Sequence, residues 1–171
     1  SDEIKSDLEE LYPDKKLTRQ DYQNLGDEKR RRFGNDYWAK RAGERISKMM
    51  SGGKSKFVID SFRNPAEVLW FRNKFRMITV AIDAPFELRL KWAVKRMRSI
   101  DPALYLDKLI KDLERDMGRG QPEYGQQVSE CMALADKLII NDGTEEELGE
   151  KVEATLLSVG AEGNHNHREK K

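Results

Sequence analysis

The sequence predicts an α/β protein in which a parallel β-sheet lies between two layers of helices. Three short apolar runs, at residues 57–59, 77–82 and 138–140, are bounded by turn residues, which is typical of strands buried on both faces. Stretches with the apolar spacing of helices alternate with these runs, and this alternation is the pattern of a three-layer parallel sheet. Polar residues follow each run, so we expect ligands to bind beyond the carboxyl ends of the strands.

Three helices are expected before the first strand. Apolar residues that recur every three to four positions place the first helix over residues 2–12. Thr18 and Asp21 have the spacing of an N-terminal cap for the second helix, and Asp36 is placed to cap the third. The glycine pair at 52–53 is expected to end the third helix.

Two further capping signatures mark helices in the second half of the chain. Asn64, Pro65 and Glu67 read as an N-cap, a first-turn proline and a reciprocal acid, so a helix starts soon after the first strand. Thr144 and Glu147 have the same capping-box spacing before the last helix. The polar residues 160–171 are expected to form a disordered tail.

Composition favours one compact cytoplasmic domain. A chain of 171 residues can bury roughly 70% of the surface that it exposes when unfolded. The 32 Lys and Arg residues nearly balance the 31 Asp and Glu residues, so nucleic acid is not an expected partner. No apolar run is long enough for a membrane span, and no charged-then-apolar leader is present.

The single cysteine and the two histidines do not indicate a reactive or metal site. Cys131 lies at helical spacing from Val128 and Ala135, which predicts a small buried hydrophobe. His165 and His167 have no carboxylate or cysteine companions in the polar tail, so no metal site is expected.

Gly53, Lys54 and Ser55 match the last three letters of the phosphate-binding loop G-x-x-x-x-G-K-[ST]. The full motif would need a glycine at position 48, where the chain has Lys48. The order is also wrong, because that loop connects a strand to a following helix, whereas these residues follow a helix and precede a strand. We interpret them as a solvated turn.

A more informative polar stretch begins at Asp60, directly after the first predicted strand. A carboxylate at this position can orient a magnesium-bound water or a sugar hydroxyl. Arg63, beside the start of a helix, can hold an anion through two hydrogen bonds. A capped turn with a surface arginine explains the same residues equally well.

Arginines gather on two other parts of the chain, and each group has two interpretations. Arg30, Arg31 and Arg32, near the end of the second helix, could hold an acceptor phosphate or complement the helix dipole. A second group resembles a lid that closes over phosphates, although charged residues on helices are commonly solvated. This group comprises Arg89, Arg96, Arg98, Arg115 and Arg119.

Four stretches together resemble P-loop nucleoside and nucleotide kinases. They are LTRQDYQNLGDEKRRRFGNDYWAKRA from residue 17, DSFRNPAE from residue 60, VAIDAPFELR from residue 80, and RDMGRGQPEYGQQVSECMALADKLIINDGTEEEL from residue 115. The resemblance covers residues 1–157 and is nearest to deoxynucleoside-monophosphate-kinase-like proteins and dephospho-coenzyme A kinases, including the kinase-like region of some deoxycytidylate deaminases. Such motifs in this order are more specific than any one alone.

The resemblance implies transfer of the γ-phosphate of ATP, with Mg²⁺, to a small nucleotide-like acceptor, with a deoxynucleoside monophosphate favoured. It implies acceptor-binding helices over residues 1–52, core strands within 56–83, lid-bearing helices over 86–135, and a last strand and helix over 137–159. The implied catalytic residues are Arg96, Asp60 and Arg89, and the implied ATP-binding residues are Asn141, Gly143, Thr144 and Arg98. The implied acceptor-binding residues are Asp2, Arg30, Arg32 and Arg63.

The chain departs from these kinases at its front. They begin with two strands and a phosphate loop, whereas the first residues of this sequence resemble the segment that comes after the second strand in the kinases. Loss of the central first strand would leave unpaired backbone groups on its neighbours, each costing about 1–3 kcal/mol if buried. We expect a shortened kinase, a natural short form with rearranged strands, or a chain that receives the missing strand from a partner.

Without the phosphate loop, the chain as it stands should not transfer phosphate, because positioning and charge neutralisation dominate this catalysis. The alternative function is a non-catalytic nucleotide-binding or regulatory module with a kinase-like fold.

Overall fold

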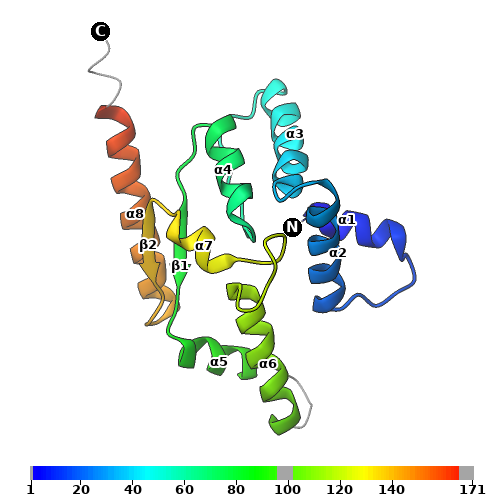
Figure 1. Cartoon of the computed structure of the whole chain (residues 1–171). Coiled ribbons are helices and arrows are strands. Elements are labelled where there is room, and N and C mark those ends of the chain that lie inside the picture. Colours follow the sequence, from blue (N-terminus) through cyan, green and yellow to red (C-terminus); the bar gives the residue numbers. More distant parts are fainter. Residues whose placement is uncertain (1, 96–101, 166–171) are drawn as a thin grey trace. The chain divides into compact units, whose positions relative to one another are not determined.

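The computed structural model describes residues 2–95 and 102–165, and it is an α/β protein dominated by helices (Figure 1). The chain divides into two compact units, which are described separately. The first unit comprises residues 1–77 and 111–134, and the second comprises residues 78–110 and 135–171.

Helices make up most of the first unit. Helices α1 (Asp2–Leu11), α2 (Arg19–Phe33) and α3 (Tyr37–Ser51) contact one another in pairs, and α4 (Pro65–Lys74) packs on both α3 and α7 (Val128–Ala133). The last part of α6 (Pro102–Met117) also belongs to this unit.

The core of the first unit lies between α3 and α4. Ala39 and Ile46 of α3 pack with Phe71 of α4, which is only 1% exposed. Trp70 lies so close to Gly43 that an added Cβ on the glycine would lie 2.3 Å from its ring. The absence of a side chain at Gly43 therefore allows Trp70 to pack against α3.

The capping predictions are confirmed at three of four helix starts. Thr18 with Asp21, Asn64 with Glu67, and Thr144 with Glu147 each form a capping box with reciprocal hydrogen bonds. Asp36 occupies the N-cap position of α3 as predicted, but its side chain makes no capping hydrogen bond and forms an ion pair with Lys40 at 2.9 Å instead. A neighbour at i+4 competes for that carboxylate.

The second unit contains a parallel two-stranded sheet. Strand β1 (Val80–Asp83) pairs with β2 (Lys137–Ile140) from Val80 opposite Lys137 to Asp83 opposite Ile140. Helix α5 (Phe86–Lys95) follows β1, and α8 (Glu145–His165) follows β2 and packs against it.

The predicted strand at residues 57–59 is not formed. These residues are extended without a strand partner among the described residues, and the side chain of Val58 is 98% exposed. The two strands that form are also not buried on both faces, because Ile82 is 52% and Leu138 is 61% exposed. A short apolar run predicts burial only if other parts of the chain cover it, and here they do not.

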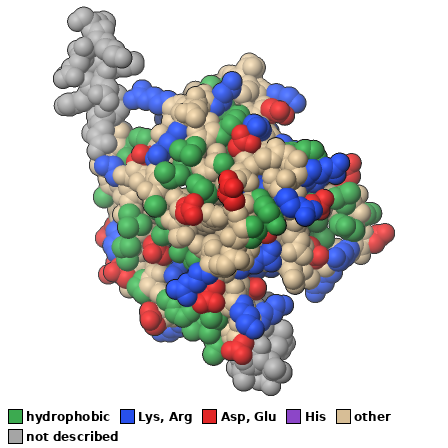
Figure 2. Space-filling view, viewed as in Figure 1, with side chains coloured by type: hydrophobic (Ala, Val, Ile, Leu, Met, Phe, Trp, Pro, Cys, Tyr) green, Lys and Arg blue, Asp and Glu red, His purple; other side chains and the backbone are tan. Residues whose placement is uncertain are grey.

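Residues 160–165 were expected to be disordered, but α8 continues as far as His165. The remaining tail residues, 166–171, lie outside the described residues. Within residues 2–95 and 102–165, no helix combines the length and apolar character needed to cross a membrane. Basic and acidic side chains are interspersed on the face shown in Figure 2, so this face carries no large patch of one charge.

Candidate ligand pocket

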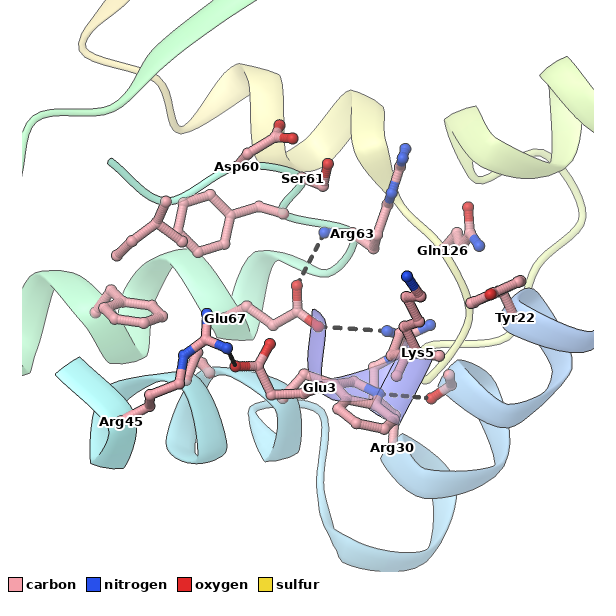
Figure 3. Close-up of a pocket in the computed structure, with 18 of the residues that line it drawn as sticks. Glu3, Lys5, Tyr22, Arg30, Arg45, Asp60, Ser61, Arg63, Glu67 and Gln126 are labelled. Atoms are coloured by element: carbon pink, nitrogen blue, oxygen red, sulfur yellow. Dashed lines mark hydrogen bonds and ion pairs between the residues drawn. The ribbon is translucent and has the colours of Figure 1, made fainter. Parts of the chain in front are cut away.

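A pocket of about 750 Å³ lies entirely within the first unit. Helices α1, α2 and α3 and the segment 57–63 supply most of its walls (Figure 3). Helix α4 supplies Glu67 and Phe71, and α6 and the loop before α7 supply one residue each. Trp38, Ala39, Ile46 and Phe71 form a buried apolar part of the lining. The other walls carry charged and amide side chains, so one molecule with apolar and polar ends would fit.

Most charged residues of the pocket are paired with one another. Arg45 lies 3.4 Å from Glu3, Arg30 lies 3.3 Å from Glu67, and Arg19 pairs with Asp116. Lys5 reaches a residue outside the pocket, Glu9, at 3.7 Å. Two charged residues of the lining then remain, Asp60 and Arg63, and neither side chain has a protein partner among the described residues.

The backbone of Arg63 is held on both sides. Its N–H donates to the Glu67 carboxylate at 2.9 Å, and its carbonyl accepts from the N–H of Gln127 at 2.7 Å. Arg63 is a half-buried residue whose guanidinium is an unpaired cation on a fixed backbone, and Figure 3 shows it near Asp60 and Ser61 at the pocket. A pre-positioned arginine of this kind is suited to a phosphate or carboxylate.

Ser61, between Asp60 and Arg63, has a left-handed backbone conformation with φ of 72°. Among the described residues other than glycine, it is the one with such a positive φ. This conformation is unfavourable for a residue with a Cβ and is often found at functional turns. Ser61 lies between the two unpaired charges in the sequence.

Arg30 is placed at the pocket as predicted, but its guanidinium is committed to the protein. Its three nitrogens donate to the carbonyl of Tyr124 at 2.7 Å, to Glu67 at 3.3 Å and to Asp27 at 2.6 Å. With the side chain only 2% exposed, Arg30 joins α2, α4 and the loop before α7. The predicted role in acceptor binding is not what these contacts indicate.

Glu67 is the acidic centre of this network and is 5% exposed. Burial raises the pKa of its carboxyl, while the charge of Arg30 and the backbone N–H groups of Arg63 and Asn64 act in the opposite direction. The donors thus offset only part of the effect of burial, and the pKa of Glu67 is raised overall.

Gln126 is a pocket residue to which the sequence assigns no role. Its side chain is 6% exposed, and its Oε1 is buried without a hydrogen-bond partner among the described residues. The neighbouring Gln127 differs, because its Nε2 donates to the carbonyl of Pro122 at 3.2 Å. The repeated glutamine in the sequence gave no sign of which one faces the pocket.

Arg32, another predicted acceptor residue, is not among the residues that line the pocket. Arg32 is exposed, and its guanidinium lies 5.1 Å from the ring centre of Phe33. Asp2 is the first residue of α1. Arg30 and Arg63 are predicted acceptor residues that reach the pocket lining.

Of the predicted lid residues, Arg115 and Arg119 lie in the first unit, where they pair with Asp27 at 2.7 Å and Glu114 at 2.9 Å. The predicted ATP-site residues and the other lid residues belong to the second unit or to the undescribed segment. Arg89 lies 3.6 Å from Asp83. The N–H of Asn141 donates to the carbonyl of Asp83 at 2.7 Å, and the Thr144 hydroxyl accepts from the N–H of Glu147, which caps α8. An added Cβ on Gly143 would lie 1.8 Å from a carboxylate oxygen of Glu147, so that side chain would have to move. Arg96 and Arg98 lie outside the described residues.

Cys131, predicted to be a buried hydrophobe, is buried. Burial raises the pKa of its thiol to about 12, with the charge of Glu67 acting in the same direction. A thiol with such a pKa is not a nucleophile at neutral pH. The described residues also contain no group of three or more His, Cys, Asp or Glu placed to hold a metal ion.

Comparison with known proteins gives relatives in archaea. The chain is 34% identical over 109 residues to a UPF0200 protein of Pyrococcus horikoshii, which covers 62% of this chain and 54% of that protein. A UPF0200 protein of Thermoplasma volcanium is 32% identical, with 70% of this chain and 60% of the relative covered. The chain thus spans little more than half the length of these curated relatives.

The match to a UPF0200 protein of Methanothrix thermoacetophila covers more of both proteins. It is 35% identical over 133 residues, which are 77% of this chain and 68% of that protein. No protein-family model matches the chain. No solved structure matches it either. The identity and coverage to the Methanothrix protein show that this chain belongs to the UPF0200 family.

Proposed function

We propose that the first unit binds the acceptor of a phosphotransferase of the nucleoside and nucleotide kinase type. The acceptor is a small phosphate-bearing nucleotide, with a deoxynucleoside monophosphate favoured. One observation carries the proposal: the unpaired guanidinium of Arg63 lies on a fixed backbone at the edge of a pocket of about 750 Å³.

Charge supports an anionic ligand. A half-buried cation without a counter-ion is unfavourable, and a phosphate would supply both the charge and the hydrogen-bond acceptors. Three other cations of the lining, Arg19, Arg30 and Arg45, already have carboxylate partners. Arg63 is therefore the side chain of the described lining to which a phosphate would bind most favourably.

Size and lining support a nucleotide rather than a bare anion. Small-molecule pockets generally measure about 300–1,000 Å³ and combine an apolar wall with a few polar groups. Trp38, Phe62 and Phe71 supply aromatic surface in this pocket, against which a base could pack. The charged and amide groups of the lining would hold the phosphate and the sugar.

Asp60 fits the Mg²⁺ that the kinase resemblance implies, but as a single ligand. The described residues hold no metal cluster, so the protein alone would bind Mg²⁺ weakly. Mg²⁺ commonly keeps several waters and binds through one or two carboxylates together with substrate phosphates. Asp60 would orient a water of an ion that arrives with the nucleotide.

Titration calorimetry with the four deoxynucleoside monophosphates tests the proposal. We expect binding by the unmodified chain and a loss of about 10- to 100-fold in affinity for Arg63→Gln, as for a charge-assisted bidentate contact. Arg32→Gln is the matched control, because Arg32 is an exposed arginine outside the pocket. Equal affinity of Arg63→Gln and the unmodified chain would refute the proposed role of the pocket.

A non-catalytic nucleotide-binding or regulatory module is the second candidate. It is favoured by Lys48, which stands where a phosphate loop ending in Lys54 and Ser55 would need glycine. The same titration, followed by measurement of ADP formed from ATP and Mg²⁺ by a longer chain that includes a phosphate loop, separates the two. Binding without turnover by that longer chain supports the module, whereas turnover supports the phosphotransferase.

A further inference from the structure

We infer that Gln126 determines ligand specificity by accepting a hydrogen bond from an N–H or O–H group on the organic part of the nucleotide. This inference rests on the proposed function of the same pocket. It assigns Arg63 to the phosphate and Gln126 to the base or sugar.

The reason is the unsatisfied oxygen of Gln126. Its Oε1 is buried and has no donor among the described residues, although the residue lines the pocket. Buried side-chain oxygens are nearly always hydrogen-bonded, because burial without a donor is unfavourable. A donor on a ligand in the pocket would satisfy it.

The backbone around Gln126 is held firmly, so its side chain starts from a fixed point. On one side, the N–H of Gln127 donates to the carbonyl of Arg63 at 2.7 Å. On the other side, the buried carbonyl of Gly125 accepts from Nδ2 of Asn64 at 3.2 Å. A site fixed before the ligand arrives discriminates well between ligands that do and do not complete its hydrogen bonds.

Chemistry separates the roles of the two residues. A carbonyl oxygen and a phosphate oxygen are both acceptors and repel each other, whereas the Arg63 guanidinium carries only donors. Both residues line one pocket, as Figure 3 shows, so one nucleotide could place its phosphate at Arg63 and a donor at Gln126. The opposite orientation of the Gln126 amide would direct its NH₂ group toward the pocket and favour contact with phosphate.

The test compares Gln126→Met with Gln127→Met, a matched control whose side chain contacts Pro122 outside the pocket. The probes are the deoxynucleoside monophosphate that binds most tightly and inorganic phosphate. We expect Gln126→Met to weaken the nucleotide at least about tenfold and to leave phosphate unchanged, with little effect of Gln127→Met. Equal weakening of both probes would overturn the inference in favour of a phosphate contact.

Analogues of the same nucleotide identify the donor. One lacks the exocyclic amine or ring N–H of the base, and the other lacks the sugar 3′-hydroxyl. The analogue without the relevant donor should bind the unmodified chain as weakly as Gln126→Met does, and should lose no further affinity in that variant. Additive losses for both analogues would overturn the inference.

The outcomes distinguish this inference from the proposed function. Nucleotide binding that depends on Arg63 but is unchanged in Gln126→Met refutes the inference alone. Absence of binding by the unmodified chain refutes the proposed function, and the inference with it. Far-UV circular dichroism of each variant confirms that the comparison is made between folded proteins.

Discussion

Replacement of Arg30 by methionine tests whether this arginine stabilises the fold or serves a ligand. The guanidinium is 2% exposed and donates to Tyr124, Glu67 and Asp27. Methionine fills much of the same volume without a charge. The variant leaves the buried Glu67 carboxylate without its cation, whereas Asp27 keeps Arg115 at 2.7 Å.

The expected destabilisation follows from the loss at Glu67. Removing one partner of a buried ion pair typically costs about 3–5 kcal/mol, because the other charge stays buried. A single domain is stable by only about 5–15 kcal/mol, so Arg30→Met should unfold at a much lower urea concentration. Arg32→Met, on the same helix but exposed, should change the stability by less than about 0.5 kcal/mol.

The pH dependence gives a second signature. Arg30 lowers the pKa of Glu67 against the effect of burial, so its removal raises the folded-state pKa further above that of the unfolded chain. Between these two values the folded state binds more protons than the unfolded state, and stability falls as pH rises. The unfolded state is the same for both proteins, so the difference in stability between Arg30→Met and the unmodified chain should widen as pH rises through the already raised folded-state pKa of Glu67 in the unmodified chain.

Urea unfolding followed by circular dichroism at several pH values measures both effects. The second substitution Glu67→Gln, added to Arg30→Met, removes the buried charge and should restore much of the lost stability. A loss below about 1 kcal/mol for Arg30→Met, or a difference that does not change with pH, would refute the structural role of Arg30.

Two further predictions concern residues near the pocket. Ser61→Gly should raise the free energy of unfolding by up to about 1 kcal/mol, since glycine adopts the positive φ of 72° without steric conflict; a lower midpoint in thermal unfolding would contradict this. Cys131 should resist alkylation by iodoacetamide at about pH 8 until the protein is unfolded, because its thiol has a pKa of about 12. As pH rises above the ordinary thiol pKa of about 8.5, only the unfolded thiol ionises, so this residue's contribution to stability should fall; rapid native alkylation would show that the thiol is accessible.

Local signals in the sequence were sufficient for the helices. A capping box depends on residues three positions apart, and those at Thr18, Asn64 and Thr144 are all formed. The strands were less predictable, because their burial depends on distant segments. Residues 57–59 have the apolar character of a core strand, yet among the described residues no strand pairs with them, and Val58 remains exposed.

In the candidate site, too, local sequence signals indicated some residues, whereas the role of others depends on distant parts of the chain. Asp60 and Arg63 were found because they immediately follow an apolar run and precede a helix cap. The role of Arg30 was misjudged, because its partners Glu67 and Tyr124 lie 37 and 94 positions away and turn a basic patch into a buried network. Gln126 could not be told from Gln127 in the sequence, since only packing decides which amide is buried.

The first unit is built from two stretches of chain, residues 1–77 and 111–134. Asn64 shows the dependence of one on the other: its Nδ2 donates to the carbonyls of Glu123 and Gly125, which lie 59 and 61 positions later. During synthesis, therefore, the helices that form most of the pocket emerge from the ribosome long before the loop that completes it. Closing so long a loop is entropically unfavourable, so pocket assembly is expected to be a late step of folding.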